Sequence, residues 1–157
     1  MTRTYLIVLT CFLLSASTIA QTISGELKKW HAVTIEFTDD ESYSETGATN
    51  PFLDRRLTVT FTSPSNNTYQ VPGYFAADGN AAETSATSGN KFHVKFSPDE
   101  VGTWSYSASF RQGNDVAITY PSSPTDGTAN SPINGQSGSF TIAATRSEER
   151  RVGKSVD

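Results

Sequence analysis

Apolar and polar residues alternate along several short segments of this chain. A strand whose side chains point in turn to a buried and a wetted face produces this period of two. The outward positions are mostly Ser and Thr, which favour strands over helices. The alternation predicts strands within residues 33–37, 57–62, 69–71, 92–96, 104–110 and 140–142, with a weaker run at 116–120. Since no segment after residue 20 has a sustained helical period, the sequence predicts an all-β fold, an antiparallel β-sandwich of about seven strands.

Turn-forming residues stand between these segments. Residues 63–67, Ser-Pro-Ser-Asn-Asn, predict a polar hairpin loop, and residues 78–80, Asp-Gly-Asn, predict a turn. Residues 81–90 are mostly small and indicate a surface loop. Residues 121–138 are rich in Pro, Ser, Gly and Asn, so we expect a long loop with little to bury before the last strand.

The most specific local pattern is the corner that leads into the segment at 104–110. Glu100, Gly102, Trp104 and Tyr106 follow one another at alternate positions after a strand that ends at a proline. An acid, a small residue and an aromatic residue recur at this spacing before the sixth strand of immunoglobulin-like domains. Tyr106 stands where such domains usually have a disulfide cysteine. The pattern therefore predicts an immunoglobulin-like sandwich with a cysteine-free core.

The first twenty residues have the features of a secretory signal peptide. A short positive start precedes an apolar run at residues 5–14, and small residues precede Gln21. The run is shorter than the roughly 20 apolar residues that a membrane span needs. Cys11, the chain's one cysteine, lies inside it, so the mature chain would have no disulfide. We expect an exported bacterial protein, secreted or periplasmic, without a membrane anchor after cleavage.

Residues 146–157 differ from the rest of the chain. They are charged, they have no apolar face, and they resemble the conceptual translation of a short-read sequencing adapter. We expect a disordered tail of artefactual origin, a domain at residues 21–145, and a chain that is the front piece of a longer protein. The alternative is a genuine solvated tail, which charge runs of this kind usually are.

The charge balance narrows the range of partners. The chain has 16 acidic and 12 basic residues, for a net charge of −4, and no basic stripe. Nucleic acid and anionic membranes are therefore excluded as expected partners. A neutral partner such as a glycan is compatible with this charge, although charge does not select it.

Catalytic chemistry has few candidates in this sequence. Glycoside hydrolysis needs two carboxyl groups roughly 5–9.5 Å apart across a cleft. The acidic run Asp39-Asp40-Glu41 lies beside expected turns, which predicts a solvated loop. His31 and His93 have no spaced partner for a metal, and the mature chain has no cysteine. We expect no catalytic residue, no metal site and no cofactor.

Aromatic residues are the remaining candidates for contact with a partner. Trp104, Tyr106 and Phe110 share one face of their strand and are expected in the core. Tyr74 and Phe75 follow a Pro-Gly turn and precede a small-residue loop. They are the best candidates for a patch that contacts either a glycan or another domain, with packing or domain docking favoured over sugar binding.

Four blocks of the chain together resemble a known family, domain of unknown function 5060. The blocks are residues 25–37, 50–61, 71–80 and 92–104, and the resemblance extends over residues 25–144. This family is an immunoglobulin-like module that precedes a (β/α)-barrel in secreted glycoside hydrolase-like proteins. It has no assigned catalytic residues in this module.

The resemblance implies a non-catalytic N-terminal accessory module of a secreted carbohydrate-active protein. Its partner would be the C-terminal catalytic barrel of the full-length chain, which this sequence lacks, and polysaccharide is a second candidate partner. The alternative function is an independent carbohydrate-binding or adhesion module. A third and weaker hypothesis is that the chain is a complete small enzyme.

Overall fold

The computed structural model describes residues 21–120, 123 and 126–144. The signal peptide and tail expected at residues 1–20 and 146–157 lie outside these residues. Within the described part, no helix is long and apolar enough to cross a membrane.

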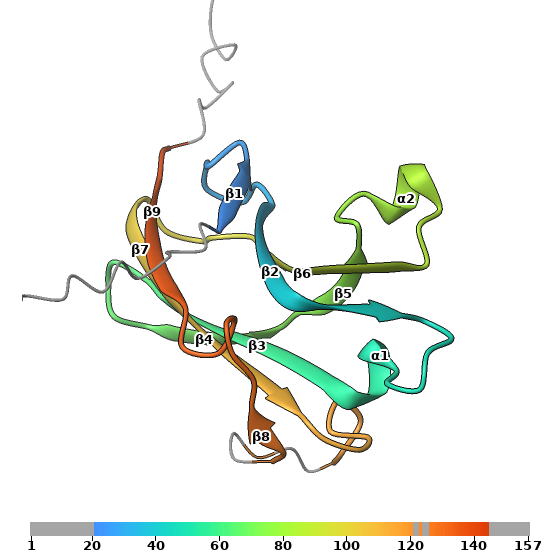
Figure 1. The fold of residues 1–157 in the computed structure, drawn as a ribbon. Helices are drawn as coiled ribbons and strands as arrows, with labels where there is room; N and C mark the ends of the chain where they lie inside the picture. The colour runs from blue at the N-terminus through green and yellow to red at the C-terminus, as the bar shows by residue number, and fades with distance from the viewer. Residues whose placement is uncertain (1–20, 121–122, 124–125, 145–157) are drawn as a thin grey trace, which may run out of the picture.

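Strands dominate the described part, and the two helices there are single four-residue turns (Figure 1). The elements are β1 (Thr22–Gly25), β2 (Val33–Ser44), α1 (Pro51–Asp54), β3 (Arg55–Thr62), β4 (Thr68–Pro72), β5 (Tyr74–Ala77), α2 (Ala81–Thr84), β6 (Ser88–Phe96), β7 (Gly102–Gln112), β8 (Thr128–Ala129) and β9 (Ser137–Ile142). The predicted all-β class is confirmed.

The strands form two antiparallel sheets. One sheet has the order β1-β2-β6-β5. The other has the order β4-β3-β7, with both β8 and β9 paired to the far edge of β7. This arrangement corresponds to the ABED and CFG sheets of an immunoglobulin-like sandwich, with β4 added beside the C strand. β7 then takes the place of the sixth strand that the corner pattern predicts.

The core lies between the inner faces of the two sheets. Alternate residues of β2, β3, β6 and β7 are buried, as a half-exposed strand requires. Aromatic rings join the sheets across this core. The ring centroids of Phe92 and Phe110 are 4.7 Å apart, and those of Phe61 and Phe96 are stacked at 4.4 Å. Offset and edge-to-face ring pairs stabilise a core beyond the area that they bury.

The corner before β7 is built as the spacing of its residues suggests. The Trp104 side chain is fully buried, and its Nε1 donates a hydrogen bond to the Glu100 carbonyl at 3.1 Å. The Glu100 carboxylate accepts hydrogen bonds from the hydroxyl of Ser63 and the backbone N–H of Ser65, so it fixes the β3–β4 hairpin loop. Gly102 has a φ of +126°, a conformation that side chains disfavour.

Tyr106 stands where the corner pattern predicts the disulfide cysteine of an immunoglobulin-like domain, and its ring makes an aromatic contact across the core. Its ring lies edge-on to that of Phe37 on β2, with centroids 6.3 Å apart. This pair joins the two central strands of opposite sheets, β2 and β7. A core held by rings needs no disulfide.

The weak alternation at residues 116–120 does not form a strand, so this prediction was wrong. The backbone there turns: Val116 N–H bonds to Gly113, and the N–H groups of Ile118 and Thr119 both bond to the Asp115 carbonyl. These local hydrogen bonds occupy backbone N–H groups that a strand would use to pair with a neighbouring strand. The turn buries Val116 and leaves Ile118 exposed.

The described residues between 126 and 138 are also less open than the composition of the segment predicts. Ile133 is fully buried in the core, and β8 within this segment pairs with the end of β7. One apolar residue in a polar loop produces no periodicity, so the sequence pattern missed it. The short strands β1 and β5 were missed as well, because Thr22–Gly25 has one large apolar residue and Tyr74–Ala77 has no polar residue that alternates with its apolar ones.

Replacing Trp104 by Ala should lower the free energy of unfolding by about 3–5 kcal/mol, because it empties a large volume at the sheet-to-sheet contact. Chemical denaturation followed by circular dichroism measures this. Trp30→Ala is the control, since that ring is 64% exposed, and its effect should stay within about 0.5 kcal/mol. Equal losses for the two variants would contradict the described core.

Candidate functional site

A surface cavity lies where the chain crosses from one sheet to the other. β4 is the edge strand of its sheet, β5 is the edge strand of the opposite sheet, and Gly73 alone separates them. The cavity has a volume of about 580 Å³ and is walled by β3, β4, β5, α1 and residues 117–120. We call it the edge cavity. A Cβ atom on Gly73 would collide with the Leu57 side chain and lie 2.9 Å from the His93 carbonyl, so a larger residue would disturb this crossing.

The edge cavity gathers most of the exposed apolar side chains of the domain. The described residues expose six large apolar side chains, and four of them line this cavity. These four are Phe52, Tyr74, Ile118 and Tyr120. Contiguous apolar exposure of this kind marks interaction sites more often than scattered exposure does.

Tyr74 and Phe75, the residues selected from the sequence, have different positions. Adjacent residues of a strand point to opposite faces. Phe75 therefore packs inward against Phe92 and is 6% exposed, whereas Tyr74 points outward and is 42% exposed. A partner at this site would meet the Tyr74 ring, while Phe75 forms the floor beneath it. The Tyr74 ring also lies edge-on to His93, with centroids 5.8 Å apart.

Phe52 is held in the cavity wall by the short helix α1. The Asn50 side chain caps this helix by accepting a hydrogen bond from the Phe52 N–H at 2.9 Å, and Pro51 follows as the first helical residue. The Phe52 ring then meets Phe75 edge-on at 5.6 Å. The Asn-Pro pair is a helix-start signal in the sequence, but nothing local indicates which cavity Phe52 joins.

Ile118 and Tyr120 reach the cavity because their turn is bonded to α1. The Ala117 N–H donates to the Leu53 carbonyl at 2.8 Å, and the Asp115 N–H donates to the Asp54 carboxylate at 3.1 Å. Sequence reasoning missed this contribution, since it placed residues 116–120 on a strand.

The two arginines in the cavity wall are already engaged. Arg56 donates to the carbonyls of Val116 and Ser123 and pairs with Asp126 at 3.4 Å. Arg55 has a side chain that is 8% exposed, and its partners are described below. By contrast, Thr58 and Gln70 line the cavity, and their side chains have no hydrogen-bond partner among the described residues.

The acidic run beside the cavity is not the solvated loop that the sequence predicted. Asp39, Asp40 and Glu41 all belong to β2, and Asp39 is 2% exposed. Asp39 occupies the next inward position after Phe37 in the same alternation, so the pattern contained the signal. The pairing of β2 with β6 becomes irregular after Thr38.

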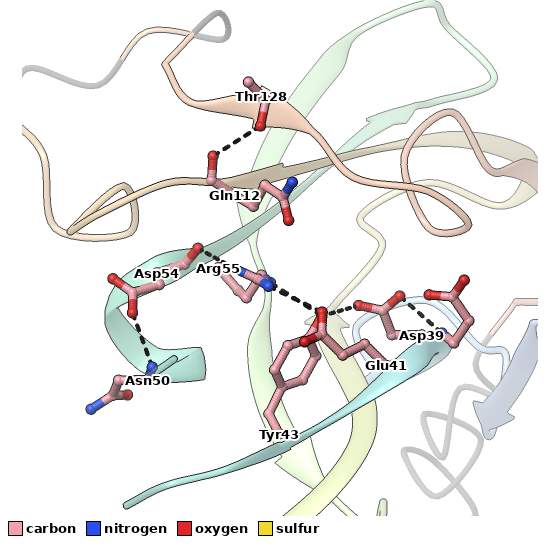
Figure 2. Close-up of polar contacts among 9 residues, drawn as sticks. Asp39, Glu41, Tyr43, Asn50, Asp54, Arg55, Gln112 and Thr128 are labelled. Carbon is pink, nitrogen blue, oxygen red and sulfur yellow. Dashed lines mark hydrogen bonds and ion pairs between the residues drawn. The ribbon is translucent and has the colours of Figure 1, made fainter. Parts of the chain in front are cut away.

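Asp39 belongs to a polar cluster that joins β2 to the start of β3 (Figure 2). The Tyr43 hydroxyl donates to the Asp39 carboxylate at 2.6 Å and lies 3.1 Å from Glu41. Arg55 Nε donates to the same hydroxyl at 3.1 Å, and its guanidinium lies over the Tyr43 ring and pairs with Glu41 at 3.3 Å. A further bond joins Arg55 to the Asp54 carbonyl. This network fixes Arg55 in the cavity wall.

Burial dominates the electrostatics of this cluster. It raises the pKa of Asp39, although the hydrogen bond from Tyr43 opposes the shift. Burial, reinforced by the bond to Asp39, also raises the pKa of Tyr43. Asp39 is inaccessible and Glu41 is paired with Arg55, so both carboxyl groups help to join β2 to the start of β3.

The two histidines lie apart in the fold. His93 on β6 pairs with Glu36 on β2 at 3.0 Å, whereas His31 lies 3.6 Å from Glu26 before β2 begins. Among residues 21–120, 123 and 126–144, no group of three or more potential ligand side chains is arranged to hold a metal ion.

These features define an all-β sandwich domain with an aromatic-lined cavity at the edge between its sheets. The sequence matches the family model of domain of unknown function 5060 over residues 26–111, which is more than half of its 157 residues. The chain belongs to this family, as the resemblance of its sequence blocks predicts.

One solved structure is similar to the chain: a "putative glycoside hydrolase" from Bacteroides vulgatus, with 20% sequence identity and a TM-score of 0.46. The similarity covers 75% of this chain and 16% of that protein, so the chain spans a small part of its length. No curated protein matches the sequence significantly.

Changing Asp39 to Asn should alter how stability depends on pH. Because burial raises the pKa of Asp39, the wild-type domain gains stability from the protonated carboxyl below the unfolded pKa of 3.8 and loses it as pH rises through the folded pKa. Asn does not titrate. The stability of the variant relative to wild type should therefore increase from about pH 3 to pH 7.

Urea denaturation of both proteins across this range measures the effect. Glu83→Gln is the control, since it also removes one negative charge, from an exposed residue of α2. A relative stability that falls with pH, or that the control reproduces, would contradict the role of Asp39 burial.

Proposed function

We propose that this domain is a non-catalytic accessory module of a longer bacterial protein, secreted or periplasmic, that acts on carbohydrate. The edge cavity is the observation that carries the proposal. It offers a partner aromatic faces and neutral polar groups, which suit contact rather than bond cleavage. Membership of domain of unknown function 5060 supports the same role.

Catalysis of glycoside hydrolysis would need two carboxyl groups that reach one glycosidic bond. Among the described residues that line the edge cavity, none is Asp or Glu. The nearby pair Asp39 and Glu41 is engaged in the polar cluster. The expected partner is a catalytic barrel that follows this module in the full-length protein.

An independent carbohydrate-binding or adhesion module is the second candidate function, and the exposed ring of Tyr74 favours it. The genomic DNA downstream of the Thr145 codon separates the two functions. A reading frame that continues into a barrel supports the accessory module. A true stop after Asp157, together with polysaccharide binding, supports the independent module.

The purified chain should release no reducing sugar from any of a panel of plant and bacterial polysaccharides, because none of the described residues that line its cavity is Asp or Glu. A reducing-end assay over a prolonged incubation measures this. Turnover that disappears in Asp40→Asn or Glu41→Gln, while the protein stays folded by circular dichroism, would refute the non-catalytic role.

A further inference from the structure

We infer that the edge cavity binds sugar rings of an uncharged polysaccharide, through the aromatic faces of Phe52, Tyr74 and Tyr120 and the free polar groups of Thr58 and Gln70. This inference rests on the proposed function, because it assigns a ligand class to the same site. It goes further in committing the cavity to a glycan instead of a protein domain.

The size of the cavity suits a small-molecule segment. Ligand sites in proteins usually have volumes of about 300–1,000 Å³, and the edge cavity has about 580 Å³. A surface that docks a folded domain is usually flatter and wider. One or a few sugar rings of a longer chain would fit the concavity and leave the remainder of the polymer in solvent.

The exposed rings provide the apolar part of the recognition. A pyranose ring has faces made of C–H groups, and an aromatic face can cover them without competing for hydrogen bonds. Tyr74 and Tyr120 are 42% and 94% exposed, and Phe52 is 47% exposed. Tyrosine combines an apolar ring with a polar hydroxyl, so it suits a ligand that has both kinds of surface.

The polar groups of the cavity select for a neutral ligand. A sugar hydroxyl both donates and accepts hydrogen bonds, and so do the Thr58 hydroxyl and the Gln70 amide. Both are without partners among the described residues. An acidic sugar would need a free cation, but Arg55 and Arg56 have side chains that are 8% and 13% exposed and are bonded to other groups.

The described end of the chain leaves the edge cavity uncovered. The last described residues are bonded at the opposite end of the sandwich, where the Lys29 N–H donates to the Ala143 carbonyl. β7 pairs with β9 at its Gly102 end and with the start of β3 at its Gln112 end. Arg55 and Arg56, at the start of β3, line the edge cavity. Figure 1 shows how β7 runs between β9 and β3. Eleven strand residues separate these ends, a length of about 35 Å.

Affinity gel electrophoresis of the 157-residue chain tests the inference. The probes are three neutral polysaccharides, hydroxyethylcellulose, arabinoxylan and galactomannan, and one acidic polysaccharide, polygalacturonate. At least one neutral polysaccharide should retard the protein, and polygalacturonate should not. Tyr74→Ala and Tyr120→Ala should each weaken that binding by about tenfold or more.

Two controls separate the site from general effects. Trp30→Ala removes another exposed ring, 64% exposed and outside the cavity, and should leave binding unchanged. Tyr120 is almost fully exposed, so Tyr120→Ala should keep the wild-type melting temperature even if Tyr74→Ala does not.

The inference is overturned if none of the three neutral polysaccharides retards the protein, or if Tyr74→Ala and Tyr120→Ala both bind as wild type does. Self-association that Tyr120→Ala abolishes would likewise overturn it, by showing a protein contact at the cavity. Each of these outcomes leaves the accessory function intact, because that proposal is tested separately, by the reading frame after Thr145 and by the absence of hydrolytic activity.

Discussion

The structure depends on aromatic contact between two sheets that no disulfide joins in the described part. Rings from β2 and β6 meet rings from β3 and β7. The Phe37–Tyr106 pair joins β2 to β7, which correspond in sheet order to the two strands that a disulfide bridges in antibody domains. Rings bury large areas and prefer a few relative orientations, so they hold both the spacing and the register of the sheets. Trp104 extends this contact to the corner that fixes the β3–β4 loop.

The edge cavity is a consequence of that packing. The chain crosses between the sheets at Gly73, and the alternation of β5 turns Phe75 into the core and therefore Tyr74 outward. The same core residue supports Phe52 from α1. The exposed Phe52 ring is thus held from beneath by a buried one, so a ligand would meet this part of the surface preformed. Preorganised contacts of this kind reduce the entropy that binding has to overcome.

The polar cluster of Asp39, Glu41, Tyr43 and Arg55 has a structural part in this arrangement. It joins the outer end of β2 to the start of β3 and holds the Arg55 guanidinium against the Tyr43 ring. The cavity therefore has no free cation from Arg55, and this disfavours an acidic ligand. A buried carboxyl with a raised pKa would in another setting suggest an acid catalyst, but here Asp39 is covered by its own strand and its partners.

Local pattern by itself determined the class of fold, the main strands, the burial of Trp104 and the corner at Glu100, because side-chain alternation and turn chemistry are local properties. It also selected Tyr74, one wall of the cavity. Only the tertiary structure decided that Phe52 and Tyr120 join it, that Ile133 fills the core and that Asp39 is buried. These outcomes depend on which distant segments become neighbours. Sheet order, the crossing at Gly73 and the bonds between α1 and the 113–120 turn set that proximity, and no short window of sequence contains it.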